Sequence, residues 1–328
     1  MKGIYILNTP AYDLIYGEPE RRRIAELVDI YAGQQTAQSV QADPTILAEA
    51  DLIFSGWGCP KFTAELLDAA PKLKAVFYGA GTVRYFVSDA FWARGIQLSS
   101  GWAANAVPVA EYTLAQILFG LKSGWQHVLV YRETRKLTRV PVAGAFGSTV
   151  GLISLGMIGR LMVERLKPFD VRVIAYDPFV TPAEGASLGV EMVGLDELFR
   201  RADVASLHTP WLPETERLIT GAHLLSLKPY ATFINTARGA IVREDEMIAV
   251  LQQRPDLVAV LDVTYPEPPA ADSPLYTLPN VIITPHIAGS MQAECRRQGQ
   301  YMIAELERYL AGQPLQYGLT RAKAAIMA

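Results

Sequence analysis

The sequence predicts an α/β protein built of two doubly wound domains, each with a parallel sheet that helices cover on both faces. Three observations support this fold class. Strand-like and helix-like segments alternate along almost the whole chain. A small-residue turn joins the apolar run Val150–Ile153 to a helical run that begins at Met157. The length of 328 residues is enough for two domains, each with its own core.

The first third of the chain alternates between short apolar runs and helical spacing. The runs predict strands near Gly3–Leu7, Leu52–Ser55, Ala75–Tyr78 and Ile96–Leu98. Helical spacing predicts helices over Glu18–Tyr31 and Thr63–Ala69, and a longer helix from about Ala106 to Lys122. These segments predict one doubly wound domain followed by a connecting helix.

The turn after Val150–Ile153 has the pattern of a dinucleotide-binding motif. The segment Ser154–Gly159 reads S-L-G-M-I-G, and a second β-rich run over Val171–Ala175 is followed by Asp177. Glycines let the backbone approach a pyrophosphate, and the helix N-terminus faces its negative charge. An acidic side chain after the second strand binds the ribose hydroxyls, so Asp177 favours NAD over NADP. The usual first glycine is Ser154, which costs about 1 kcal/mol if the position needs a positive φ.

The middle of the chain contains enough strands for a complete dinucleotide-binding domain. The predicted strands are Val150–Ile153, Val171–Ala175, Val204–Leu207, Thr232–Asn235, Val258–Asp262 and Val281–Thr284. A last helical run extends from Met291 to Ala311. We therefore assign residues 105–290 to a central Rossmann dinucleotide-binding domain and residues 1–104 with 291–328 to a flavodoxin-like substrate-binding domain. Hinges are expected near Asn105 and after Pro285, and the ligand is expected in a cleft between the domains.

Composition and charge argue against several classes of protein. The 30 basic and 33 acidic residues leave a net charge of −3, which gives no electrostatic basis for binding nucleic acid or an anionic membrane. No apolar run approaches the roughly 18 residues of a membrane span, and Met1–Asn8 has the pattern of a strand rather than of a signal peptide. Cys59 and Cys295 lie far apart without metal-ligand spacing. We expect reduced thiols, a cytoplasmic protein and no metal.

Three predicted strand ends carry side chains that suit hydride-transfer chemistry, namely Arg238, Glu267 and His286. Loops at the carboxyl ends of parallel strands converge on one crevice. Arg238 can hold an anionic substrate through two N–H groups and polarise its carbonyl. His286 can exchange the proton that accompanies a hydride, because an imidazole titrates near neutral pH. Glu267 can accept a hydrogen bond from the other imidazole nitrogen and stabilise the imidazolium.

In these motifs the sequence resembles the D-isomer-specific 2-hydroxyacid dehydrogenase family, over nearly the whole chain. The segments that carry the resemblance are Gly79–Gly81, Asn105–Ala106, Val109–Glu111, Val150–Gly159, Tyr176–Pro178, Leu207–Pro210, Asn235–Gly239, Asp262–Pro268 and Thr284–His286. The resemblance implies that Arg238, Glu267 and His286 form the catalytic trio. It also implies a homodimer, formed through the long helix Ala106–Lys122.

The same resemblance implies where the cofactor and substrate bind. NAD would lie along Gly156–Gly159 and Asp177, and Asp262 would contact the nicotinamide carboxamide. The full set of expected cofactor-binding residues is Ser154, Gly156, Met157, Ile158, Gly159, Asp177, His208, Thr209, Pro210, Thr236, Ala237 and Asp262. The substrate carboxylate would meet the N–H groups of Ala80 and Gly81. The expected substrate-binding residues are Ala80, Gly81, Trp57, Tyr78, Asn105 and Arg238.

The chain departs from the family pattern at a few positions. Thr82–Phe86 follows Gly81 where the family often has Asp followed by Asn or His. Trp57, Tyr78 and Trp102 are bulky where substrate loops are expected. These aromatic residues favour a larger keto acid. Tyr230 stands where a helix-ending glycine is common. We expect His208 to bond to backbone near the cofactor rather than to act as acid or base.

We therefore expect an NAD-dependent dehydrogenase that interconverts a 2-keto acid and the D-2-hydroxy acid. Because no regulatory extension follows the last helical run, we do not expect a serine-pathway enzyme with an effector domain. Two alternatives stay open. One is a non-catalytic NAD(H)-sensing binding protein on the same scaffold, which an exposed partner-binding groove or tail would favour. The other is a dehydrogenase of a small oxyanion such as phosphite, which would use the same Arg, Glu and His.

Overall fold

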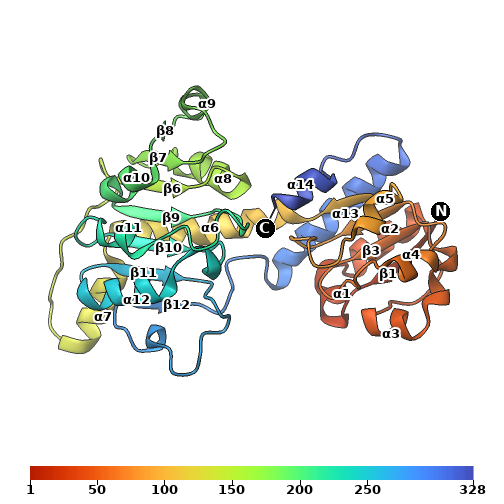
Figure 1. Ribbon diagram of the computed structural model, residues 1–328, viewed down its shortest axis with the longest axis horizontal. Helices are drawn as coiled ribbons and strands as arrows, with labels where there is room; N and C mark the ends of the chain where they lie inside the picture. Colours follow the sequence, from red (N-terminus) through yellow and green to blue (C-terminus); the bar gives the residue numbers. More distant parts are fainter. Residues whose placement is uncertain (328) are drawn as a thin grey trace. The chain divides into compact units, whose positions relative to one another are not determined.

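The computed structural model describes residues 1–327, and the chain divides into two compact units (Figure 1). The first unit contains Met1–Asn105 and the chain from Ser290 onward. The second unit contains Ala106–Gly289. Each unit is an α/β structure with one sheet, as the alternating sequence pattern predicts. Within residues 1–327, no helix is long and apolar enough to cross a membrane.

The sheet of the second unit is entirely parallel and has the strand order β12-β11-β10-β9-β6-β7-β8. The strands are β6 (Thr149–Ile153), β7 (Arg172–Tyr176), β8 (Glu191–Met192), β9 (Val204–Leu207), β10 (Thr232–Asn235), β11 (Val258–Leu261) and β12 (Val281–Ile283). From β6 the chain moves outward to β8 and then returns to the other side of β6. This is the order of a Rossmann domain, whose ligand crevice opens where the direction reverses, between β6 and β9.

Helices cover both faces of this sheet (Figure 1). The helices are α6 (Trp102–Leu121), which begins in the first unit, α7 (Gly124–Thr134), α8 (Met157–Leu166), α9 (Pro182–Ser187), α10 (Leu195–Arg201), α11 (Gly221–Leu225) and α12 (Glu244–Gln253). Phe199, Leu224 and Met247 of α10–α12 bury one face, together with Phe233 of β10. Helices α6 and α8 bury the other face, around Ile234. The apolar β strands are therefore buried on both sides, as parallel sheets require.

The sheet of the first unit has the order β13-β5-β4-β3-β1-β2. Its strands are β1 (Lys2–Ile6), β2 (Asp29–Ile30), β3 (Leu52–Ser55), β4 (Ala75–Tyr78), β5 (Gln97–Ser100) and β13 (Gly318–Leu319). The order β2-β1-β3-β4-β5 is the flavodoxin-like one that we expected. The predicted strands pair in parallel, and a short strand that the sequence did not indicate, β13, adds an antiparallel edge beside β5.

The helices of the first unit lie on both faces of its sheet. They are α1 (Thr9–Ile15), α2 (Glu18–Leu27), α3 (Ala37–Ala42), α4 (Ala64–Asp68), α5 (Asp89–Ala93), α13 (Cys295–Leu310) and α14 (Arg321–Ala325). The α3–α5 side and the α1, α2 and α13 side bury separate apolar clusters. Short 3₁₀ helices lie at η1 (Pro44–Glu49), η2 (Gly239–Ile241), η3 (Pro274–Tyr276) and η4 (Gln292–Glu294).

Three predicted helix boundaries are wrong. The helix expected over Glu18–Tyr31 ends at Leu27, because the N–H groups of Asp29 and Tyr31 bond to the carbonyls of Met1 and Gly3 and form β2. The long helix starts at Trp102 rather than Ala106, so the expected hinge at Asn105 lies inside α6. The last helix starts at Cys295, after the 3₁₀ turn η4, rather than at Met291.

A buried carboxylate attaches the C-terminal segment to the first unit. Glu305 of α13 is fully buried, and its Oε2 accepts the Ser99 hydroxyl at 2.8 Å and the Tyr317 N–H at 2.9 Å. Its Oε1 accepts the Gln316 N–H at 2.9 Å. Burying a carboxylate is favourable only when its oxygens receive donors, and these donors come from β5 and from the segment before β13. Glu305 therefore holds the antiparallel strand in place.

We predict that Glu305→Ala destabilises the first unit by about 2–4 kcal/mol, because it leaves buried donors without an acceptor. Glu305→Gln should cost less, since one oxygen remains. Urea unfolding followed by tryptophan fluorescence measures both. Glu307→Ala on the same helix is the matched control, because Glu307 forms an exposed ion pair with Arg23. Equal losses in the variants at 305 and 307 would contradict the role assigned to Glu305.

Candidate active site

The turn after β6 is bonded to the end of β7. Ser154 has a φ of +83°, and its N–H donates to the Tyr176 carbonyl at 2.7 Å. The Asp177 carboxylate accepts the Ser154 hydroxyl at 3.2 Å and the Leu155 N–H at 2.8 Å through Oδ2. Its Oδ1 accepts the Phe179 N–H at 2.8 Å. The expected acidic residue and the expected glycine-rich turn are thus in direct contact.

The two glycines of the turn have different surroundings. Gly156 precedes α8 as its N-cap, and a Cβ added there would have no heavy atom within 4 Å. A Cβ at Gly159 would lie 2.2 Å from the Ser154 carbonyl oxygen. Gly156 therefore leaves the backbone open at a helix N-terminus, and Gly159 allows close packing of the helix against the strand. With Asp177 beside it, this donor and acceptor set fits the pyrophosphate and ribose of a dinucleotide.

His208 follows β9 and is enclosed by the fold. Its Nε2 lies 3.0 Å from the Ser206 hydroxyl, while its Nδ1 is buried without a hydrogen-bond partner among the described residues. The expected bond to backbone is therefore wrong. Burial lowers the pKa of His208 to about 4, so the ring is neutral at pH 7. A neutral, enclosed imidazole is unsuited to acid–base work there.

Arg238 lies in a tightly held turn after β10. Asn235 shapes the turn: its Oδ1 accepts the Ala237 N–H at 3.0 Å and its Nδ2 donates to the Arg238 carbonyl at 3.2 Å. Burial lowers the pKa of the Arg238 guanidinium, and the nearby charge of Glu267 opposes this effect. An arginine nonetheless stays protonated in proteins. A Cβ on Gly239 would lie 2.0 Å from the Thr264 carbonyl carbon, so a glycine is needed for this turn to approach the loop after β11.

Glu267 and His286 form a close pair. The Glu267 Oε1 lies 2.6 Å from the His286 Nδ1, and both side chains are about half exposed. Two contacts support the Glu267 loop: the Thr264 hydroxyl donates to the Pro266 carbonyl at 2.8 Å, and the Tyr265 N–H donates to Glu244 at 3.1 Å. Since Nδ1 faces the carboxylate, Nε2 is the ring atom left to exchange a proton with a ligand.

A buried acid holds the chain that carries His286. Asp262 accepts the N–H groups of Ile287 and Ala288, both at 2.8 Å, and the Thr284 hydroxyl at 2.6 Å. The His286 N–H donates to the Asp262 carbonyl at 3.0 Å, and His286 has a φ of +54°. The Tyr112 hydroxyl of α6 lies 2.9 Å from the Thr284 hydroxyl. The contact between Tyr112 and Thr284 could not be predicted from the sequence, because only the fold brings α6 next to β12.

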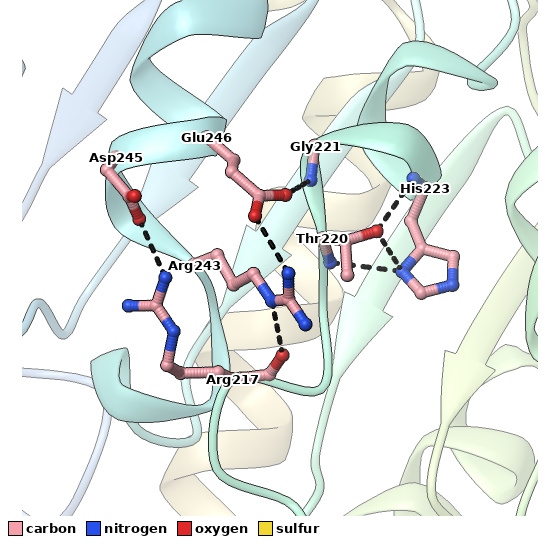
Figure 2. A network of polar contacts seen from close by, with 7 residues as sticks. All are labelled: Arg217, Thr220, Gly221, His223, Arg243, Asp245 and Glu246. Carbon is pink, nitrogen blue, oxygen red and sulfur yellow. Dashed lines mark hydrogen bonds and ion pairs between the residues drawn. The ribbon is translucent and has the colours of Figure 1, made fainter.

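A second polar network fixes the chain after Arg238 (Figure 2). Arg243 donates to the Arg217 carbonyl at 3.2 Å and to Glu246 at 2.9 Å, and Glu246 also accepts the Gly221 N–H at 2.7 Å. These two donors lower the pKa of Glu246. Asp245 accepts a bond from the Arg217 guanidinium at 3.2 Å. The loop after β9 is thereby attached to the start of α12.

Residues 122–288 match the family model described as D-isomer specific 2-hydroxyacid dehydrogenase, NAD binding domain. The chain belongs to this family. The matched segment covers the Rossmann sheet and includes Asp177, Arg238, Glu267 and His286. The roles of these residues within the matched segment stay predictions.

Individual relatives agree with this membership. The D-3-phosphoglycerate dehydrogenase of Mycobacterium tuberculosis is 37% identical over 251 residues, which are 76% of this chain and 47% of that protein. The D-3-phosphoglycerate dehydrogenase of Methanocaldococcus jannaschii is 31% identical over 269 residues, 81% of this chain and 51% of that protein. This chain thus spans about half the length of these relatives.

A solved structure shows the same fold. The D-isomer specific 2-hydroxyacid dehydrogenase of Lactobacillus delbrueckii ssp. bulgaricus, in its NAD complexed form, superposes with a TM-score of 0.81. The match covers 98% of this chain and 100% of that one at 21% identity. At this identity the likeness concerns the fold alone.

The remaining residues expected to bind the cofactor lie after a strand or at the start of a helix. Met157 and Ile158 begin α8, and Thr209 and Pro210 follow His208 after β9. The Thr236 hydroxyl lies 3.2 Å from that of Thr113 on α6. Their contacts with NAD stay predictions. Among the described residues 1–327, no group of His, Cys, Asp or Glu side chains is placed to hold a metal ion.

Ala80 and Gly81, the expected carboxylate-binding residues of the first unit, follow β4. Their carbonyls accept the Ser100 hydroxyl at 2.8 Å and 2.6 Å, which fixes the turn. Within residues 1–327, neither of their N–H groups donates a hydrogen bond. These N–H groups are therefore available to a ligand, and their role stays a prediction.

The other expected substrate residues are more enclosed. Tyr78 is 1% exposed and its hydroxyl lies 2.6 Å from that of Tyr85, while burial raises the Tyr78 pKa. Trp57 is partly buried against the cores on both faces of the sheet. Asn105 Oδ1 accepts the Ser290 N–H at 2.8 Å and so joins the two chain segments at the unit boundary. Substrate contacts of these residues stay predictions.

We predict that His208 makes the protein less stable in acid. Its pKa falls from 6.5 in the unfolded chain to about 4 in the fold, so below pH 6.5 the unfolded chain binds a proton that the folded one does not. The free energy of unfolding therefore has its full value above pH 6.5, and it decreases as the pH falls from 6.5 to 4. Between pH 7 and pH 5 the wild type should lose about 2 kcal/mol more than His208→Gln. Urea unfolding at both pH values measures this, and equal losses would contradict the lowered pKa.

Proposed function

We propose that this protein is an NAD-dependent oxidoreductase that interconverts a 2-keto acid and the D-2-hydroxy acid. The observation that carries the proposal is the Glu267–His286 pair, 2.6 Å apart, at the same sheet edge as Arg238 and within the family's NAD-binding domain. These residues follow the neighbouring strands β10, β11 and β12. Reduction of a keto acid requires a cationic group that binds the acid and a group that donates a proton. It also benefits from a carboxylate that stabilises the protonated form of the proton donor.

Arg238 binds and polarises the substrate. Its guanidinium can donate two parallel hydrogen bonds to the keto acid and draw electron density from the carbonyl. Its partial burial strengthens this interaction, because water screens the charge less there. We propose that the N–H groups of Ala80 and Gly81 bind the substrate carboxylate.

His286 moves the proton. In the reductive direction the imidazolium donates its Nε2 proton to the carbonyl oxygen, and Glu267 stabilises the charged ring through Nδ1. In the oxidative direction the neutral Nε2 accepts the hydroxyl proton. Bound NAD(H) supplies or accepts the hydride. The turn Ser154–Gly159 and Asp177 would hold the cofactor.

We further propose a cytoplasmic homodimer, with α6 at the subunit contact, because the family resemblance implies it. The two cysteines, Cys59 and Cys295, are free and buried, which suits a reducing compartment. Size-exclusion chromatography with light scattering tests the dimer.

The direct test is NADH oxidation against 2-keto acids from glyoxylate and hydroxypyruvate through pyruvate to branched and aromatic ones. Turnover on one size class identifies the substrate class. NADH binding without turnover on any of them, or turnover of phosphite instead, would contradict the proposal and favour the sensor or the oxyanion dehydrogenase.

We predict that His286→Ala lowers kcat by about 10²–10⁴-fold and leaves the Kd for NADH unchanged. Glu267→Gln should also lower kcat, because the imidazolium loses the charge that stabilises it. Steady-state rates and NADH fluorescence titration measure both effects. Asp196→Asn is the matched control, because Asp196 is an exposed carboxylate 3.0 Å from the imidazole of His223. Near-normal turnover in His286→Ala would refute the proton-transfer assignment.

We predict that Arg238→Lys raises KM for the keto acid and lowers kcat. Lysine keeps the positive charge but loses the planar pair of donors, and we expect kcat/KM to fall by about 10²-fold. Rates over a range of keto-acid concentrations separate the two effects. An unchanged KM would show that Arg238 does not bind the substrate.

A further inference from the structure

Ser154 adopts a backbone conformation that suits glycine. Its φ is +83°, and it occupies the first position of the motif, where the usual residue is glycine. An L-residue is strained in this region, because its Cβ crowds the backbone. A glycine would remove this strain at no cost to the turn. What distinguishes the serine is therefore the contact that its hydroxyl makes.

That contact is with Asp177. The Ser154 Oγ donates to Asp177 Oδ2 at 3.2 Å, and the Leu155 N–H donates to the same oxygen at 2.8 Å. The Phe179 N–H donates to the other oxygen, Oδ1, at 2.8 Å. Donors on both oxygens fix the plane of the carboxylate. Of these three donors, two are backbone N–H groups and one is a side chain, the Ser154 hydroxyl.

The backbone of Ser154 is itself held on both sides. Its N–H donates to the Tyr176 carbonyl at 2.7 Å, next to Asp177 in the chain. Its carbonyl oxygen packs against Gly159, where a Cβ would lie only 2.2 Å away. Arg160 donates to the carbonyl of the next residue, Leu155, at 3.0 Å. The hydroxyl therefore projects from a rigid part of the turn.

We propose that Ser154 is a positioning residue that orients the Asp177 carboxylate toward the ribose hydroxyls of NAD. The same orientation keeps the negative charge of Asp177 where it would repel the 2′-phosphate of NADP. The inference rests on the proposed function, in which Asp177 binds the cofactor. A carboxylate that is already fixed loses less conformational entropy when it binds the ribose, which favours binding. It also keeps a negative charge where an extra phosphate would lie, which discriminates against NADP.

Two substitutions separate the hydroxyl from the strain. Ser154→Ala removes the hydroxyl and keeps the Cβ, and Ser154→Gly removes both. Each should raise the Kd for NADH by about 3–10-fold and narrow the preference for NADH over NADPH. Ser154→Gly should also melt about 2–4 °C above Ser154→Ala, because only glycine relieves the strain. Fluorescence titration with NADH and NADPH and thermal unfolding measure these effects without any turnover.

A double-mutant cycle with Asp177→Asn tests the pathway through the carboxylate. In the Asp177→Asn background, Ser154→Ala should cause no further loss of NADH affinity. Ser187→Ala is the matched control, because it removes a hydroxyl of α9 that bonds to the Glu184 carbonyl at 2.7 Å. That variant should bind NADH like the wild type.

The outcomes distinguish this inference from the proposed function. A wild-type protein that does not bind NADH overturns the proposed function, and the inference with it. A wild type that binds NADH, with an unchanged Kd in Ser154→Ala, overturns the inference alone. The inference is also overturned if Ser154→Ala lowers the NADH affinity equally in the wild-type and Asp177→Asn backgrounds. The hydroxyl would then act on the cofactor without Asp177.

Discussion

The arrangement of His286 and Glu267 in the second unit depends on one buried acid, Asp262. Its carboxylate lies at the end of β11 and receives the N–H groups of Ile287 and Ala288 together with the Thr284 hydroxyl. A carboxylate is stable in such a place only when its oxygens are filled by donors, so the chain after β12 must wrap around it. This wrapping gives His286 its left-handed backbone and brings its Nδ1 to the Glu267 carboxylate.

The parallel sheet supplies the rest of the arrangement. Strands β10, β11 and β12 are neighbours, so the residues that follow them emerge at one edge. Gly239 permits the Arg238 turn to touch the loop that leads to Glu267, because no side chain separates the two backbones. On the other side of the switch point, Ser154 and Asp177 join β6 to β7. The residues proposed for proton transfer and those proposed for cofactor binding thus follow different strands of the same sheet.

Much of this could be predicted from the sequence, because the signals are local. Apolar runs marked the strands, and the turn at Ser154–Gly159 with Asp177 marked the dinucleotide motif. Predictions were wrong where a distant partner decided the outcome. The segment after Leu27 became a strand because β1 offers it backbone carbonyls. The prediction for His208 was wrong for a different reason: the fold encloses its ring, which contacts the side chain of Ser206, two residues away in the chain. Tyr230, which stands where a helix-ending glycine is common, has a φ of +64°, and its N–H donates to Asp256.

The sequence by itself determined the α/β class, the order of the strands along the chain and the identity of Arg238, Glu267 and His286, since residue spacing and motif chemistry are local properties. The tertiary structure decided which atoms these residues present. It directed Nδ1 of His286 to Glu267, connected Tyr112 of α6 to Thr284, and placed the Ser154 hydroxyl on Asp177. These contacts join residues from different elements. They form only when the whole unit folds, because strand pairing, burial and backbone strain determine which atoms meet.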